Sequence, residues 1–275
     1  MTLFVATLIF ILGSAVGSFL SVIIYRLQTK KKGIIFSRSF CPSCKKKLKW
    51  KHLIPIFSWI FLRGKCAYCG KQISSHYLVM EFLTGLLFLA AFLNWNFLEV
   101  IPSTIDPNLL NYSINWHNLE LVVFYFIEFS LLLAIFFYDL MHKEIPDKLS
   151  LPAIGIAIAG GLVFGTPSPL SMLIGGGGIM LFFALQFFLS KGKWIGGGDL
   201  RLGALMGILL GWEKGLLALI LAYLVGAVIS IALLTRKKVT GKTTIPFGPF
   251  LITGTLIALF YGSEIITWYF NLITI

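Results

Sequence analysis

Two aspartates beside long apolar runs are the first residues whose placement suggests chemistry. Asp139 closes the run LLLAIFFYDL (131–140), and Asp199 follows the glycines of GGGDLRLGALMGILLGW (196–212). Asp139 would lie in the last turn of a helix, where the dipole disfavours an anion, and Asp199 at a helix start, where backbone N–H groups favour one. Two carboxylates in unlike surroundings could act as an acid and as a base that activates water. Unrelated polar anchors at helix ends would leave the same pattern, so both interpretations stay open.

Asp147, a third acidic residue near this region, has a structural explanation. It follows Pro146 at the start of another apolar run, where an aspartate or Ser150 can accept hydrogen bonds from the free N–H groups of a first helical turn. We therefore expect Asp147 to cap a helix rather than to take part in chemistry.

All four cysteines lie in one basic segment, as CPSC (41–44) and CAYC (66–69) with 21 residues between the pairs. Each CxxC pair can present two thiolates to one metal, and the two pairs together complete a tetrahedral four-cysteine zinc site. Such a metal would also explain how a short, lysine-rich segment folds. We predict zinc bound by Cys41, Cys44, Cys66 and Cys69. Reduced cysteines without metal, or a redox pair, are the alternatives.

The composition indicates a membrane protein. Hydrophobic residues make up 57% of the 275 residues and charged residues only 12%, about half the share usual in soluble domains. The first apolar window is long, and its basic residues follow it, which indicates a retained helix rather than a cleaved signal peptide. Windows long enough to cross a bilayer recur along the chain. We expect eight spans, of which the sixth is short, at approximately 3–26, 77–98, 118–138, 149–165, 169–190, 199–212, 214–235 and 246–272.

The distribution of charge predicts the orientation of these spans. Residues 26–76 hold 13 lysines and arginines and no acidic residue. With alternating sides, the loops on that side carry 22 basic residues and the opposite side only Lys214. By the positive-inside rule the N-terminus lies outside and the basic loop is cytoplasmic. Its charge is what topology requires, so we expect anionic lipid headgroups as its partner and no nucleic acid.

Five stretches in order resemble the bacterial type IV prepilin peptidases, membrane aspartic proteases of the GxGD class. The similarity runs nearly from end to end of the chain. GxGD alone would be weak evidence, whereas the ordered set is highly specific. The stretches are GSFLSVIIYRL (17–27), the cysteine loop (41–74), YDLMHKEIPDKL (138–149), GGGDLRLGALMGILLGW (196–212) and IPFGPFL (245–251).

The resemblance implies a catalytic pair of Asp139 and Asp199 and excludes Asp147, which aligns with a position not regarded as catalytic. It also implies that water attacks directly at the cytoplasmic face of the inner membrane. The glycines before Asp199 and the motif of the last span would shape the site or bind substrate. These residues are Gly196, Gly197, Gly198, Phe247, Gly248 and Pro249.

The same resemblance implies the substrate and a second activity. The family cleaves the basic leader of type IV prepilins or pseudopilins after a glycine, and members with the cysteine loop commonly methylate the new N-terminal residue with S-adenosylmethionine. No G-x-G-x-x-G nucleotide loop independently supports methylation. His76 and Leu78 stand where arginine and proline are typical, and Arg201 replaces a usual lysine.

The predicted fold is an all-α polytopic membrane protein of about eight transmembrane helices, with a small cytoplasmic zinc-binding loop domain between the first two. We expect a first helix over 1–26, the four-cysteine domain over 27–76 and a seven-helix peptidase domain over 77–275. Two alternatives to a bifunctional enzyme are a peptidase without methyltransferase activity and a non-enzymatic zinc-ribbon scaffold or transporter. A transporter would be expected to place its carboxylates near the midplane of the membrane.

Overall fold

The structure is a computed structural model and describes residues 2–29, 39–102, 110–236 and 244–273. The basic residues Lys30, Lys31, Lys32, Arg38, Lys237, Lys238 and Lys242 and the acidic Asp106 lie outside the described residues. The chain forms two compact units, Met1–Ala134 and Ile135–Ile275. Each unit is described by itself.

Seven helices among the described residues are long and apolar enough to cross a membrane, as expected for a polytopic protein. Their outward faces are apolar: Leu3, Leu173 and Val228 are 81%, 70% and 67% exposed. Glu128 and Asp139, by contrast, are buried. Apolar surface facing outward and polar groups within are typical of helices solvated by lipid. The seven are α1 (Thr2–Thr29), α3 (Ser75–Asn94), α4 (Trp116–His142), α5 (Asp147–Phe164), α6 (Pro169–Leu189), α7 (Gly197–Thr235) and α8 (Gly248–Ile273).

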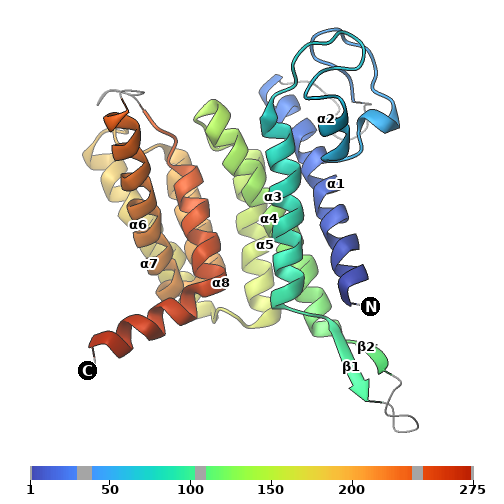
Figure 1. The fold of residues 1–275 in the computed structure, drawn as a ribbon. Coiled ribbons are helices and arrows are strands. Elements are labelled where there is room, and N and C mark those ends of the chain that lie inside the picture. Colours follow the sequence, from blue (N-terminus) through green and yellow to red (C-terminus); the bar gives the residue numbers. More distant parts are fainter. Residues whose placement is uncertain (1, 30–38, 103–109, 237–243, 274–275) are drawn as a thin grey trace. The chain divides into compact units, whose positions relative to one another are not determined.

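The first unit is built on α1 and α3, with the first part of α4 (Figure 1). Gly13 of α1 lies so close to α3 that an added Cβ would be 2.8 Å from the Thr84 carbonyl oxygen. Phe88 of α3 stacks on Phe126 of α4 with ring centroids 3.9 Å apart. Small residues and aromatic rings therefore allow these helices to pack by close van der Waals contact, without the hydrophobic effect that drives packing in water.

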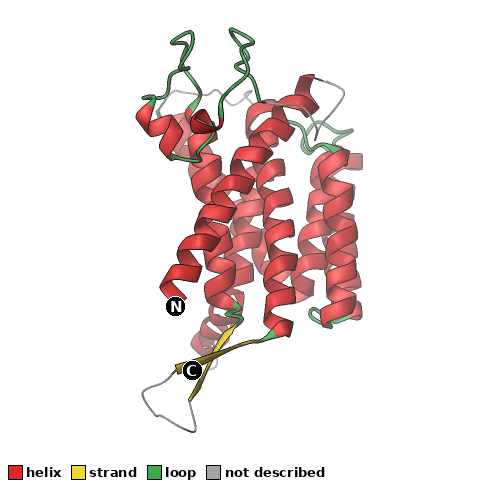
Figure 2. Ribbon diagram, turned by 90° about the vertical axis from the view of Figure 1, so that its right-hand side faces the viewer, coloured by secondary structure: helices red, strands yellow, loops and turns green. Residues whose placement is uncertain are grey.

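Two features of the first unit are not long helices. The cysteine loop between α1 and α3 contains only the 3-10 turn η1 (Trp50–His52) and the short α2 (Phe57–Phe61). An antiparallel hairpin, β1 (Leu98–Pro102) and β2 (Leu110–Ile114), joins α3 to α4 and pairs Leu98 with Ile114. This hairpin was not among the expected elements, and its two strands are the yellow segments in Figure 2.

The second unit contains the end of α4 and helices α5 to α8, whose ends follow local signals. Pro146 precedes α5, and Gly165 ends it in the left-handed conformation. Ser168 caps α6 by accepting a hydrogen bond from the Ser171 N–H, with Pro169 at the first helical position. Helix α7 packs on α5, α6 and α8 and is thereby the centre of this unit (Figure 1).

Helix α7 is broken at Gly211, where φ is 76° and ψ is −176°. In a straight helix Gly203 and Gly215 would be about 18 Å apart. Yet an added Cβ at either residue would touch the same side chain, Ile179 of α6, and one at Gly215 would be 3.4 Å from the Gly207 Cα. The chain therefore turns back at Gly211, and the sixth and seventh expected spans form one interrupted element.

The break should depend on glycine at position 211. A side chain there would occupy a left-handed backbone conformation and would contact Ser171, whose hydroxyl accepts the Trp212 N–H at 3.1 Å, and Pro167. We expect Gly211→Ala to lower the free energy of unfolding by about 1–3 kcal/mol, measured by thermal unfolding in detergent. Gly177→Ala is the matched control because nothing lies within 4 Å of an added Cβ. Equal melting temperatures for the two variants would contradict the assigned break.

Candidate active site

Asp139 and Asp199 come together at one end of the second unit. The Gly248 N–H donates to Oδ2 of Asp139 at 2.9 Å, and the Gly196 N–H donates to Oδ2 of Asp199 at 3.0 Å. The carboxylates are close enough for the charge of Asp139 to act on Asp199. Each carboxylate thus has one oxygen held by backbone, which leaves the other available for chemistry.

The surroundings of Asp139 differ from those that the sequence predicts. Asp139 is 4% exposed and does lie in the last turn of α4, at the negative end of that helix. However, its carboxylate accepts a hydrogen bond from the first residue of α8, so it also faces the positive end of another helix. The tertiary fold therefore provides the stabilisation that the local sequence lacks.

Gly248 is required by the approach of Asp139. A Cβ at this position would be 2.6 Å from Oδ2 of Asp139 and 3.4 Å from the Ile145 Cδ1. Ile145 is closer still to Gly198, where a Cβ would be 2.7 Å from the Ile145 Cβ. Ile145 therefore lies between the two glycines that neighbour the carboxylates. No role was predicted for Ile145, because an isoleucine outside a helix has no functional group that would indicate one.

An aromatic cluster borders the same site. The Phe247 ring lies 5.1 Å from Tyr223, 6.1 Å from Phe183 and 6.2 Å from Phe250, measured between centroids. The Tyr223 hydroxyl pairs with the side chain of Gln186, and Tyr223 also interacts electrostatically with Asp199. Tyr223 lies 24 residues after Asp199 in an apolar run, so only the reversal at Gly211 could bring it to the site.

The other predicted site-shaping residues have different surroundings. Gly196 holds Asp199 through its N–H, whereas Gly197 is exposed and nothing lies within 4 Å of a Cβ built on it. Pro249 is buried in the first turn of α8, and its carbonyl accepts the Thr253 hydroxyl at 2.8 Å. Gly197 and Pro249 make no hydrogen bond to either carboxylate among the described residues.

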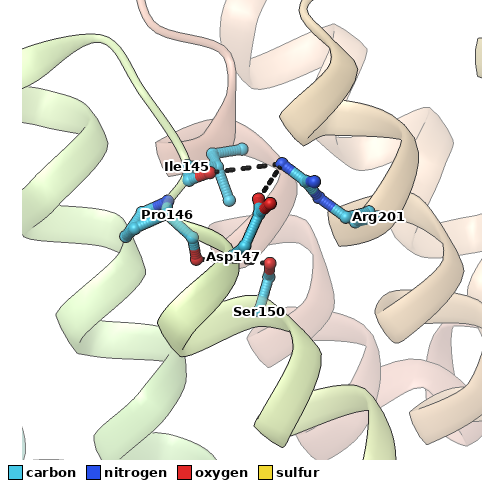
Figure 3. Close-up of polar contacts among 5 residues, drawn as sticks. All are labelled: Ile145, Pro146, Asp147, Ser150 and Arg201. Carbon is cyan, nitrogen blue, oxygen red and sulfur yellow. Dashed lines mark hydrogen bonds and ion pairs between the residues drawn. The ribbon is translucent and has the colours of Figure 1, made fainter.

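Asp147 forms an ion pair with Arg201 rather than a cap. No side-chain cap is present at the start of α5, while an Arg201 nitrogen contacts the Asp147 carboxylate and also donates to the Ile145 carbonyl at 3.4 Å (Figure 3). Ser150 donates its hydroxyl to the Pro146 carbonyl at 3.3 Å. The capping role predicted for Asp147 is wrong because the fold places a cation of α7 beside the start of α5. The ion pair holds the segment that carries Ile145 against the helix that carries Asp199.

The four cysteines form a second candidate site, in the first unit. Their sulfur atoms all lie within 4.8 Å of one another, and those of Cys41 and Cys69 are 3.9 Å apart. Four sulfurs around a tetrahedral zinc ion would be about 3.8 Å apart, so the cluster fits such an ion with small adjustments. The backbone N–H of Cys44 is the main cause that lowers the pKa of the Cys41 thiol to about 6, which favours the metal-binding thiolate. The described residues therefore provide a site that could hold a metal ion.

The two CxxC segments have the same backbone geometry. Cys41 accepts a hydrogen bond at its carbonyl from the Lys45 N–H at 2.8 Å, and Cys66 accepts one from the Gly70 N–H at 2.9 Å. Lys45 and Gly70 both have positive φ, at 57° and 67°. The repeated turn presents both thiols of each pair to a common centre, as the spacing in the sequence predicts.

The chain is similar to known proteins both in the region of the cysteine loop and in the region of the two aspartates. Residues 11–95 match the Bacterial Peptidase A24 N-terminal domain, and residues 126–231 match the Type IV leader peptidase family. The chain belongs to the type IV leader peptidase family. No solved structure matches it significantly.

Relatives in this family match the chain over nearly its whole length. A "Prepilin leader peptidase/N-methyltransferase" of Aeromonas salmonicida is 30% identical over 97% of this chain and 94% of its own. Proteins of the same name from Legionella pneumophila and Bacillus subtilis are 32% and 30% identical, over 93% and 97% of this chain and 91% and 98% of their own. The match spans the cysteine loop as well as both aspartates.

The ion pair of Asp147 should contribute little to stability. Its side chains are 60% exposed for Asp147 and 31% for Arg201. We expect Asp147→Asn to lower the free energy of unfolding by less than about 1 kcal/mol in thermal unfolding. Arg201→Met also removes the hydrogen bond to the Ile145 carbonyl, so it should be the more destabilising variant. The reverse order would show that Arg201 does not position Ile145.

Proposed function

We propose that this protein is a prepilin leader peptidase in which Asp139 and Asp199 are the catalytic pair. The main support for this proposal is that two neighbouring carboxylates, from α4 and α7, each accept a hydrogen bond from one backbone N–H. This arrangement leaves one oxygen of each carboxylate without a backbone hydrogen bond among the described residues, at a place where the charge of Asp139 acts on Asp199. Such a pair suits attack by water without a covalent intermediate.

In the proposed mechanism Asp199 is the base and Asp139 the acid. Asp199 accepts a proton from water while the water oxygen attacks the scissile carbonyl carbon, and Asp139 donates a proton to the carbonyl oxygen. Collapse of the resulting diol breaks the C–N bond: Asp199 gives the proton that it took from water to the leaving amine, and Asp139 takes back a proton from a diol hydroxyl. Because the two groups titrate jointly, the protons belong to the pair as a whole.

We propose that the substrate is a type IV prepilin or pseudopilin, cleaved after the glycine that ends its basic leader. Phe247, Gly248 and Pro249 precede or open α8, and we propose that the non-helical segment before this helix receives a substrate strand. The aromatic cluster around Phe247 offers apolar contacts for the residues that follow the cleaved bond. Gly196, Gly197 and Gly198 would keep the approach to Asp199 open.

The proposed setting is the bacterial inner membrane, with the N-terminus outside and the active site at the cytoplasmic face. The concentration of basic residues in 26–76 supports this orientation. We propose domains at 1–26, 27–76 and 77–275, with anionic lipids as partners of the basic loop and no nucleic acid bound.

A second proposed activity is N-methylation of the new N-terminal residue, with S-adenosylmethionine as the methyl donor. It is supported by the names of relatives that match across the cysteine loop. We further propose that Cys41, Cys44, Cys66 and Cys69 bind a structural zinc ion. A peptidase without methylation is the alternative, and the mass of a processed pilin N-terminus separates the two.

Substitution of either proposed catalytic aspartate should abolish cleavage. Asp139→Asn and Asp199→Asn each remove a group that must donate or accept a proton, so the rate should fall by at least about 10²-fold. The assay follows cleavage of a prepilin by the full chain in liposomes. Asp147→Asn is the matched control and should cleave within a few-fold of the wild type, because its carboxylate is committed to Arg201.

Two results would change this assignment. Inactive Asp147→Asn with active Asp139→Asn would keep a protease but replace one member of the pair. Cleavage by all three variants would reject the aspartic mechanism.

Loss of one cysteine should remove the metal. We expect the purified wild type to contain one zinc ion per chain by elemental analysis, and Cys41→Ser to contain almost none, because three thiolates leave the tetrahedral site incomplete. The loop between α1 and α3 should then become sensitive to protease. Ser43→Ala lies in the same turn, is no ligand and should retain the metal. A metal-free wild type would contradict the zinc site.

A further inference from the structure

A cavity of about 1260 Å³ opens in the first unit, and neither aspartate of the pair is among the residues that line it. It lies between α1, the cysteine loop and the start of α3, and Cys41 and Cys66 are among the residues that line it. Its size is ample for a small-molecule ligand. Several aromatic side chains line it: Tyr25, Trp50, Trp59, Tyr68 and Tyr77.

Glu81 is the only acidic residue among the described residues that line this cavity. It is 7% exposed, and its Oε2 accepts the Ile56 N–H at 2.7 Å. Four basic residues, Arg26, Lys47, Lys49 and Lys71, also line it. The cavity therefore combines one buried carboxyl group with aromatic and basic side chains.

The backbone that holds Glu81 is strained. Ile56 has φ of 64° and ψ of −57°, a conformation rare for a β-branched residue. Strain of this kind costs about 1–3 kcal/mol and tends to persist at functional sites. Here it directs the Ile56 N–H at the carboxylate, and this hydrogen bond orients Glu81.

We propose that this cavity binds an organic cation of the methyl-transfer reaction, with Glu81 as its counter-charge. A buried carboxylate next to aromatic faces is suited to a sulfonium or ammonium group, because both the charge and the rings attract a cation. This inference rests on the proposed methyltransferase activity.

Both partners in methyl transfer carry such a group. The methyl donor S-adenosylmethionine has a sulfonium, and the acceptor has an α-ammonium before it loses its proton. The donor also carries a carboxylate, for which the lysines and Arg26 of the wall are suited. An anionic lipid headgroup would use the basic residues but would be repelled by Glu81.

The test measures binding to the full chain in nanodiscs, without turnover. Equilibrium dialysis compares S-adenosylmethionine with S-adenosylhomocysteine, which lacks the methyl group and the sulfonium charge but keeps the α-ammonium. A second arm compares a short peptide that begins with phenylalanine with its N-acetylated form. The variants are Glu81→Gln, whose amide oxygen can still accept the Ile56 N–H, and Glu128→Gln as control. Glu128 is a buried carboxylate of the same unit outside the cavity lining.

If Glu81 pairs with the sulfonium of the donor, Glu81→Gln weakens the binding of S-adenosylmethionine about tenfold or more. The affinity for S-adenosylhomocysteine then stays within twofold of the wild type. If it pairs with the acceptor, Glu81→Gln removes the preference for the free over the acetylated peptide. Glu128→Gln should change neither. Unaltered preferences in Glu81→Gln, or displacement of the donor by anionic lipid equally in both proteins, would overturn the proposal.

Prepilin cleavage in the same samples separates this inference from the proposed function. Glu81→Gln should cleave like the wild type, because Glu81 lies outside the aspartate site. A wild type that cleaves but neither binds the donor nor methylates would reject the methyltransferase activity itself. A wild type that methylates while Glu81→Gln binds both cations normally would reject only the role of Glu81.

Discussion

The hydrogen bond from the Gly248 N–H to Asp139 is the contact on which the second unit depends. A buried carboxylate at the negative end of its own helix would be costly in apolar surroundings. The start of α8 offsets this cost by supplying a backbone donor and the positive end of a second helix. The same contact sets where α8 begins and why residue 248 carries no side chain. The position of Phe247 and its aromatic neighbours follows from it.

Around this contact, the remaining parts of the site are held by short-range packing and one ion pair. Ile145 fills the space between Gly198 and Gly248, and Arg201 holds the segment before α5 by contacts to Asp147 and to the Ile145 carbonyl. The reversal at Gly211 returns α7 toward Asp199 and adds Tyr223. The aspartates are thus held by contacts from several separate segments, and the two-carboxylate reaction proposed above would require such precise placement.

The first unit follows a different physical rule. Its cysteine loop has little regular structure, and two equivalent turns with positive φ gather four sulfurs at one point. A bound metal ion would supply the folding energy that so small and charged a segment lacks. The same turns form a wall of the cavity that contains Glu81, so metal binding and the shape of that cavity are linked.

Short-range patterns in the sequence were enough to predict most of the elements and the chemical groups. Apolar windows predicted the membrane helices, the paired CxxC spacing predicted the cysteine cluster, and the ordered motifs indicated the family. These features are local, because helix length, turn geometry and motif spacing are properties of short segments.

Which side chains come into contact was determined by tertiary packing. Asp139 and Gly248 are 109 residues apart, Arg201 and Ile145 are 56 apart, and Glu81 and Ile56 are 25 apart. No local pattern encodes such contacts, since they arise when separate helices pack. For this reason the sequence predicted Asp147 as a cap, where the fold gave it Arg201 as a partner. The role of Tyr223 was missed for the same reason.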